Sequence, residues 1–206
     1  MLFRSRYKAT FLGSGALVGD FKQEWLEQKD ADGITLREAM LHAGLCIDDI
    51  PKHVREALIS IEDERFESHH GVDWKSTAKA ILGKLTGTST RGGSTITQQV
   101  IKNTTGENEV TIKRKVAEIF RALRLEKNYS KDEILETYLN LVYFGNHSYG
   151  IQAAAENYFG KDAKDLTLEE SAALAAILNN PAAFNPSGGP EKLEKLLGRY
   201  QYVLDG

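Results

Sequence analysis

A glutamate at the end of an apolar run is the first residue whose type and position could support chemistry. Glu62 follows the sequence ALISI directly, and Asp63, Phe66, His69 and Gly71 come soon after it. A carboxylate at the edge of an apolar helix face loses part of its hydration, which raises its pKa toward the range of a general base. The same pattern is also typical of a surface acid near a hydrogen-bonded structural histidine.

A second segment, GGSTITQQVIKN, combines two glycines with polar side chains. Glycines before a Ser/Thr cap predict a helix start, whose free N–H groups can bind phosphate or sugar hydroxyl groups. The two glutamines both donate and accept hydrogen bonds, as sugar recognition requires. The segment lacks the Gly-Lys-Ser/Thr ending of a P-loop, and an ordinary capped helix is the alternative. Its candidate binding residues are Ser94, Thr95, Gln98, Gln99, Lys102 and Asn103.

A third segment is strongly basic, although the chain as a whole has a formal charge of −3. A local cationic strip suggests an anionic ligand, and a solvated helix face is the alternative. Arg114 and Glu118 are spaced i, i+4 and therefore share one helix face. They form either a surface ion pair worth about 0.2–0.5 kcal/mol or a carboxylate flanked by cations beside an anionic leaving group. The basic residues are Lys113, Arg114, Lys115, Arg121, Arg124, Lys127 and Lys131.

Helical periods that would position these segments dominate the chain from Pro51 onward. The first apolar stripe consists of Val54, Leu58 and Ile61, with Arg65 on the same face, and the second of Ile112, Val116, Ile119 and Leu123. Both recur at helical spacing. Ser130 with Glu133, and Thr167 with Glu170, form capping boxes that predict two further helix starts. Strand signals are few, so the sequence predicts a mainly α fold.

Length and composition fit one globular domain, or one domain with a small subdomain, in 206 residues of which 41% are hydrophobic. The negative net charge argues against a nucleic-acid binder, and the single cysteine, Cys46, cannot form an internal disulfide. No apolar run reaches the roughly 18 residues of a membrane span. In the first 50 residues, the apolar stretch 9–19 is interpreted as ordinary domain sequence, and a short helix is expected at 35–42.

The chain resembles glycosyltransferase family 51, because five of its segments occur in that family's order and approximate spacing. The family comprises monofunctional peptidoglycan glycosyltransferases and the polymerase domain of bifunctional class A penicillin-binding proteins. The resemblance covers residues 51–186. Its segments are EDERFESHHGVD, GGSTITQQVIKN, RKVAE, KDEILETYLN, and the stretch from YFG through GIQAAAENYFGK to AALAAILNNPAAFNP.

The resemblance implies a mainly α, lysozyme-like head lobe with a small jaw subdomain that faces the membrane. The jaw corresponds to about residues 72–91, the glycosyltransferase domain to residues 51–206, and residues 1–50 to an N-terminal extension. Trp and Lys suit a lipid interface, and a helix packed into the core is the alternative. The jaw carries the apolar residues Trp74, Ala78, Ile81, Leu82 and Leu85 beside Lys75, Lys79 and Lys84.

The activity that the resemblance implies is polymerisation of lipid II, a disaccharide-pentapeptide on undecaprenyl pyrophosphate, into β-1,4 glycan strands. Transfer with inversion releases undecaprenyl pyrophosphate and needs one base on the attacking face. By motif match this base is Glu62, and Glu118 is a second catalytic glutamate that orients the cations or the leaving group. Lys102, Arg114 and Lys115 match residues that stabilise the leaving group. Ser94, Thr95, Gln98, Gln99 and Asn103 would line the cleft, and Asp63, Phe66, His69 and Gly71 support the first motif.

The implied partners are lipid II, the nascent glycan strand, the membrane surface and other cell-wall synthesis proteins, with no nucleic acid. The implied location is the extracytoplasmic face of the bacterial cytoplasmic membrane, with no anchor visible in the sequence. No metal-ligand spacing is visible, and a divalent cation of the kind that assists some relatives stays open. A lysozyme-like enzyme that cleaves glycans is one alternative, although it would not need the cations. A non-catalytic glycan- or lipid-binding module is another, although both glutamates argue against it.

Overall fold

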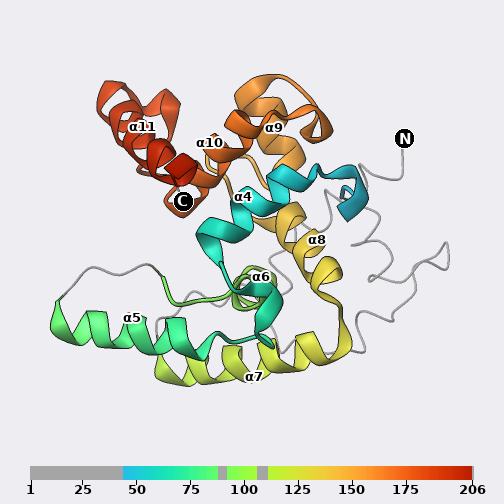
Figure 1. Cartoon of the computed structure of the whole chain (residues 1–206), viewed down its shortest axis with the longest axis vertical. Coiled ribbons are helices and arrows are strands. Elements are labelled where there is room, and N and C mark those ends of the chain that lie inside the picture. The colour runs from blue at the N-terminus through green and yellow to red at the C-terminus, as the bar shows by residue number, and fades with distance from the viewer. Residues whose placement is uncertain (1–43, 88–91, 106–110, 206) are drawn as a thin grey trace.

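The computed structural model describes residues 44–87, 92–105 and 111–205 of the chain (Figure 1). Across these ranges it contains helices and no named strand, with one isolated antiparallel bridge between Tyr143 and Tyr149. The predicted mainly α fold is therefore confirmed. The stretch 9–19 and the short helix expected at 35–42 lie outside the described residues.

Eight α-helices make up most of the described ranges, and none of them is long and apolar enough to cross a membrane. They are α4 (Lys52–Glu62), α5 (Trp74–Thr86), α6 (Ile96–Thr105), α7 (Ile112–Asn128), α8 (Lys131–Leu141), α9 (Ile151–Phe159), α10 (Leu168–Asn179) and α11 (Pro190–Asp205). Short 3-10 turns occur at Ile47–Asp49, Phe66–Ser68, Ala163–Asp165 and Pro186–Gly188.

The hydrophobic core centres on the packing of α4 against α10. Helix α10 also packs against α11, while α6 packs against both α7 and α8. Helix α4 buries Val54, Leu58 and Ile61, as its periodicity predicts. Figure 1 shows α9, α10 and α11 at one end of the molecule and α5 and α7 at the other, with α4 and α6 between them. The carboxyl end of α4 and the start of α6 therefore lie between these two ends.

Capping side chains fix where several helices begin. The predicted capping boxes of Ser130 with Glu133 and of Thr167 with Glu170 are both present, at the starts of α8 and α10. A similar reciprocal pair begins α6. The Gln98 N–H donates to Thr95 Oγ1 at 3.1 Å, and the Thr95 N–H donates to Gln98 Oε1 at 3.0 Å. These bonds satisfy N–H groups that a helix start leaves without intrahelical partners.

Helix α7 is present as predicted, but most of its apolar stripe does not face the core. Of that stripe, Ile112 is 86% exposed and Val116 is 46% exposed, whereas the buried residues of α7 are Glu118 and Ala122. Periodicity predicts that a helix has an apolar face, and it does not say what covers that face. Here ion pairs of Glu118 hold the polar face inward. The exposed apolar residues of α7 are Ile112, Val116, Phe120 and Leu123.

Arg65 does not share the apolar face of α4 as predicted, because that helix ends at Glu62. Its guanidinium group turns instead toward α5, where it pairs with both carboxylate oxygens of Asp73 at 2.6–2.9 Å. It also donates to Ser76 Oγ at 3.0 Å. Arg65 thus joins the loop after α4 to the first turn of α5.

Gly71 brings the loop after α4 into close contact with α7. Its φ of +86° favours glycine, and an added Cβ would lie 2.7 Å from the carbonyl oxygen of Ala122. The Gly71 carbonyl also accepts a hydrogen bond from Thr95 Oγ1 at 2.7 Å. The loop after α4, the start of α6 and the middle of α7 therefore meet at this glycine.

Candidate active site

Glu62 is the last residue of α4 and lines a pocket at the junction of α4, α5 and the segment before α6. Its Oε2 atom accepts a hydrogen bond from Gln99 Nε2 of α6 at 2.8 Å. Burial is the largest influence on this carboxyl group and raises its pKa. The Gln99 hydrogen bond and the charge of Arg199 partly offset the rise, while the charge of Asp63 adds to it. The desolvated carboxylate expected of a general base is therefore present.

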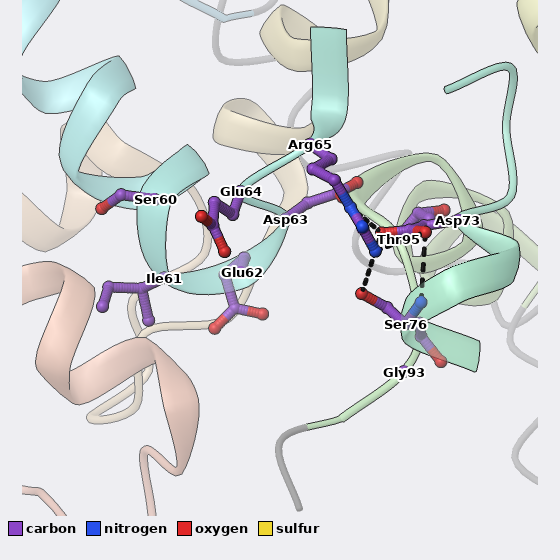
Figure 2. Close-up of a pocket in the computed structure, with 11 residues that line it drawn as sticks. Ser60, Ile61, Glu62, Asp63, Glu64, Arg65, Asp73, Ser76, Gly93 and Thr95 are labelled. Atoms are coloured by element: carbon purple, nitrogen blue, oxygen red, sulfur yellow. Dashed lines mark hydrogen bonds and ion pairs between the residues drawn. The ribbon is translucent and has the colours of Figure 1, made fainter. Parts of the chain in front are cut away.

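Arg65, Asp73 and Ser76 form the opposite side of the pocket. Figure 2 shows Glu62 projecting from the end of α4, while Arg65 points away from it toward Asp73 and Ser76. Burial raises the pKa of Asp73, but hydrogen bonds from Ser76 and Arg65, together with the arginine charge, lower it to about 2 overall. Asp73 is thus a stable anion that also caps α5, and it is poorly suited to accept a proton.

Asp63 joins the end of α4 to the start of α6. This buried carboxylate accepts two hydrogen bonds at Oδ2, from His69 Nε2 at 2.8 Å and from the Ile96 N–H at 2.9 Å. Ile96 is the first residue of α6, so its amide has no carbonyl partner within the helix. Asp63 therefore holds α6 beside Glu62, and His69 is a structural histidine in this arrangement.

Glu126 and Lys131 extend the network behind the first motif. Glu126 accepts a hydrogen bond from Thr97 Oγ1 at 2.5 Å and pairs with Lys131 at 2.7 Å. Its Oε1 also lies 3.8 Å from His69 Nδ1. Lys131 donates to the His69 carbonyl oxygen at 2.7 Å and lies 4.4 Å from the centre of the Phe66 ring. These contacts fix the two motif residues Phe66 and His69.

Glu118 forms the second charged cluster of the site. Arg114 Nη1 donates to Glu118 Oε2 at 2.7 Å, and Lys115 Nζ donates to Glu118 Oε1. The Glu118 side chain is only 5% exposed, which does not fit a surface ion pair. Lys115 Nζ also donates to Ser94 Oγ at 3.0 Å. The basic helix and the glycine-rich segment, far apart in the sequence, are therefore joined at Lys115.

The remaining predicted residues lie in different surroundings. Ser94 and Thr95 line the pocket. Gln98 is only 1% exposed, and its amide oxygen caps α6, so it holds the helix start. Lys102 and Asn103 are exposed farther along α6.

Sequence reasoning missed two residues that act on the base or on its hydrogen-bond donor. The charge of Arg199, on α11, lowers the pKa of Glu62, and nothing in the local sequence indicates this. Tyr138 of α8 donates to Gln99 Oε1 at 3.4 Å. Its hydroxyl group was the available signal, but the helical period predicts only that this residue faces the core.

No group of three or more His, Cys, Asp or Glu side chains in the described residues could hold a metal ion. The carboxylates nearest the pocket are instead satisfied by protein donors. Glu62 accepts a hydrogen bond from Gln99, and Asp73 accepts hydrogen bonds from Arg65. Asp63 accepts hydrogen bonds from His69 and from the first amide of α6.

Comparison with known proteins gives matches along most of the chain. A family model described as transglycosylase matches residues 29–206. The chain is 50% identical over 147 residues to penicillin-binding protein 1F of Bacillus subtilis (strain 168), an alignment that covers 71% of this chain and 21% of that protein. It is 49% identical over 151 residues to penicillin-binding protein 1A/1B of the same strain, covering 72% of this chain and 16% of that protein.

A monofunctional glycosyltransferase of Staphylococcus aureus (strain JH9) is 44% identical over 145 residues, covering 67% of this chain and 54% of that protein. The matched part thus spans about a fifth of the length of penicillin-binding protein 1F and about half of the monofunctional glycosyltransferase. The family match begins at residue 29, within the expected N-terminal extension, and the domain boundary at residue 51 stays a prediction.

Proposed function

Because the chain belongs to the transglycosylase family, we propose that it is a peptidoglycan glycosyltransferase domain that polymerises lipid II into β-1,4 glycan strands. One observation carries the proposal: a desolvated carboxylate and one cation of the Arg114–Lys115 pair are both hydrogen-bonded to the same short segment, residues 92–103. Glu62 is bonded to this segment through Gln99, and Lys115 through Ser94. A base for the attacking hydroxyl group and cations for an anionic leaving group are thereby held in one unit.

The reaction is a single displacement. The 4-hydroxyl of the acceptor lipid II attacks the anomeric carbon of the growing chain, and its proton passes to Glu62 as the new C–O bond forms. The bond from the anomeric carbon to the pyrophosphate oxygen breaks at the same time, and undecaprenyl pyrophosphate leaves with the electron pair. One base on the attacking face gives inversion, and the pyrophosphate needs charge stabilisation more than it needs a proton.

Arg114 and Lys115 supply that charge stabilisation, with Lys102 as a third cation from α6. Glu118 bonds to Arg114 and Lys115 and limits their rotamers, so that their remaining N–H groups are directed before the donor binds. Preorganised donors of this kind stabilise developing charge without reorganising during the reaction. Arg114 also offers a planar fork, which suits two phosphate oxygens better than a lysine does.

Two exposed apolar surfaces support contact with a membrane, where a lipid-linked substrate would be found. Trp74, Ala78 and Leu82 follow one another at i, i+4, i+8 on α5, and Trp74 and Leu82 are 59% and 62% exposed. These exposures speak against the alternative in which these two residues pack in the core. The exposed apolar residues of α7 add to this set, and Lys75 and Lys79 lie exposed beside it. Apolar side chains next to lysines suit an interface with anionic lipid.

With this function we also propose that the jaw contacts the membrane surface and that the domain works on the extracytoplasmic face of the cytoplasmic membrane. A substrate carried on a polyprenyl pyrophosphate stays in the bilayer, so its polymerase has to work at the membrane surface. Relatives named penicillin-binding protein 1F and monofunctional glycosyltransferase fit a role in cell-wall synthesis.

Incubation of the protein with lipid II in detergent tests the proposal, with polymer detected on a gel. We expect a ladder of glycan strands, and no soluble fragments when finished peptidoglycan is the substrate. Fragments from peptidoglycan without polymer from lipid II would favour the glycan-cleaving alternative. Binding without either product would indicate a non-catalytic module.

A further inference from the structure

The buried phenol of Tyr138 lies next to the candidate base, although no step of the proposed reaction uses it. Tyr138 is 0% exposed and comes from α8, a helix that packs against α6. Its hydroxyl group is 3.4 Å from Gln99 Oε1, and Gln99 is the residue that donates to Glu62. A buried hydroxyl group needs a hydrogen-bond partner, and here that partner is the amide oxygen.

The two ends of the Gln99 amide are fixed by different neighbours. An ionised carboxylate only accepts hydrogen bonds, so Glu62 selects the NH₂ group of the amide. The amide oxygen is then turned toward Tyr138, which donates to it. If the amide rotated by half a turn, its oxygen would face the Glu62 carboxylate and two acceptors would oppose each other. Tyr138 and Glu62 therefore favour the same orientation of Gln99.

Tyr138 is well suited to remain a donor. Burial raises the pKa of its phenol well above the usual value of 10, and the charges of Glu62 and Asp63 raise it further. The phenol therefore keeps its proton at any pH at which the protein would work. Glu62 changes its protonation during the proposed reaction, whereas the group that orients its partner does not.

We propose that Tyr138 is a positioning residue for the base, acting through Gln99: its hydroxyl group holds the amide in the orientation that donates to Glu62. This inference rests on the proposed role of Glu62 as the base. With the hydroxyl group absent, the amide loses one of its two anchors and spends less time donating to Glu62. Glu62 then binds its proton more readily, so less of the base is ionised at a given pH.

Tyr138→Phe tests the inference, because it removes one oxygen and keeps the ring that fills the core. The pH dependence of kcat/KM and of kcat for lipid II polymerisation is measured for the wild type and the variant. We expect the acidic limb to move to higher pH, with activity below the limb reduced about two- to tenfold, as for the loss of one hydrogen bond. KM should change little, and raising the pH should restore most of the rate. A purely structural defect would not be rescued by pH.

Two further variants make the result specific. In a Gln99→Leu background, Tyr138→Phe should have no additional effect on the pH profile, since the residue that transmits the effect is gone. Tyr158→Phe is the matched control, because it removes a tyrosine hydroxyl group that donates to the Phe144 carbonyl oxygen at 2.9 Å. Its profile should match that of the wild type.

A readout independent of turnover separates this inference from the proposed function. Carbon-13 NMR of labelled glutamate side chains, with the Glu62 signal assigned by its loss in Glu62→Gln, follows the titration of the base directly. We expect its midpoint to rise in Tyr138→Phe. An unchanged midpoint and a superimposable pH profile would overturn the role of Tyr138. If the wild type does not polymerise lipid II but the Glu62 midpoint still rises in Tyr138→Phe, the polymerase proposal is wrong. The inference that Tyr138 orients Gln99 toward Glu62 would still stand.

Discussion

Helices α4 and α7 each carry one of the two glutamates of the site, yet they use their faces in opposite ways. Helix α4 buries its apolar stripe of Val54, Leu58 and Ile61, and Glu62 comes at its end, where burial raises the pKa. Helix α7 buries Glu118 and leaves Ile112 largely exposed. Apolar burial therefore positions the proposed base, whereas ion pairs position the proposed cations.

This difference implies different costs for removing the two negative charges. Among the described residues, Glu62 accepts a side-chain hydrogen bond from one amide, that of Gln99, and burial disfavours its ionised form. Glu118 is bonded to two cations, and those cations would lose their shared partner if it were neutralised. One glutamate is thus kept reactive at the expense of stability, and the other contributes to the fold.

The largest expected effect comes from removing the proposed base at the end of α4. Glu62→Gln should reduce lipid II polymerisation by about 10²–10⁴-fold, because a general base is lost. Since the folded protein raises the pKa of Glu62, it binds this proton more tightly than the unfolded chain does, and the group's contribution to stability falls as pH rises through that window. The variant should therefore melt at the same or a higher temperature than the wild type at pH 7.

Glu56→Gln is the matched control for this experiment, because Glu56 lies on the same helix, is exposed, and pairs with the exposed Lys52 one turn away. It should polymerise like the wild type. A folded Glu62→Gln protein with near-normal activity would contradict the assignment of the base.

A core substitution and its surface counterpart sharpen the comparison of the two apolar stripes. Leu58→Ala should lower the free energy of unfolding by about 2–5 kcal/mol, since Leu58 is fully buried. Val116→Ala, on the exposed stripe of α7, should change it by less than about 0.5 kcal/mol. Denaturant titration measures both. An equal loss in the two variants would mean that the α7 stripe is covered in solution.

Removing one of the proposed leaving-group cations tests the role of α7. Arg114→Ala should lower kcat about 10–100-fold with a smaller change in KM, because contacts to the pyrophosphate strengthen as its charge develops. Arg114→Lys should also be impaired, and Lys102→Ala should bind a phosphoglycolipid mimic of the donor more weakly. Lys127→Ala, an exposed cation near the end of the same helix, is the control. Wild-type binding and turnover in both alanine variants would remove the leaving-group part of the mechanism.

The smallest expected effect concerns the exposed apolar side chains. Trp74→Ser and Leu82→Ser should each weaken binding to liposomes with anionic lipid by about fivefold, since each contributes about 1 kcal/mol when partly inserted. Their melting temperatures should stay within a few degrees of the wild type, roughly as expected for surface positions. Unchanged liposome binding together with a large loss of stability would instead identify them as packing residues.

Local signals in the sequence predicted much of this fold. Both capping boxes and the buried stripe of α4 are where the pattern places them, because caps and periodicity act within one or two turns. The pattern could not tell that the stripe of α7 is exposed, since that depends on what packs against it. It also placed Arg65 on the apolar face of α4, whereas the helix ends at Glu62 and Arg65 pairs with Asp73 at the start of α5, a contact that helical periodicity does not encode.

In the candidate site, too, local signals predicted some features, and others depend on packing between distant segments. Residue types and the family resemblance predicted both glutamates and the cations as site residues, which stays a prediction, and the apolar run before Glu62 correctly predicted the direction of its pKa shift. Gln98 was expected to line the cleft, but its role in the α6 cap requires knowing where that helix starts. Arg199 and Tyr138 act on Glu62 or Gln99 across large sequence separations, so only the packing of α11 and α8 reveals them.

The hydrogen bond from the Ile96 amide to Asp63 also gives the protein an internal reporter of its working geometry. An amide buried at a helix start and bound to a carboxylate exchanges its proton with deuterated water only when that contact opens. Its exchange rate therefore measures how often the ends of α4 and α6 separate. An inactive variant with an unchanged rate has lost chemistry, whereas one with fast exchange has lost the alignment of the two helices.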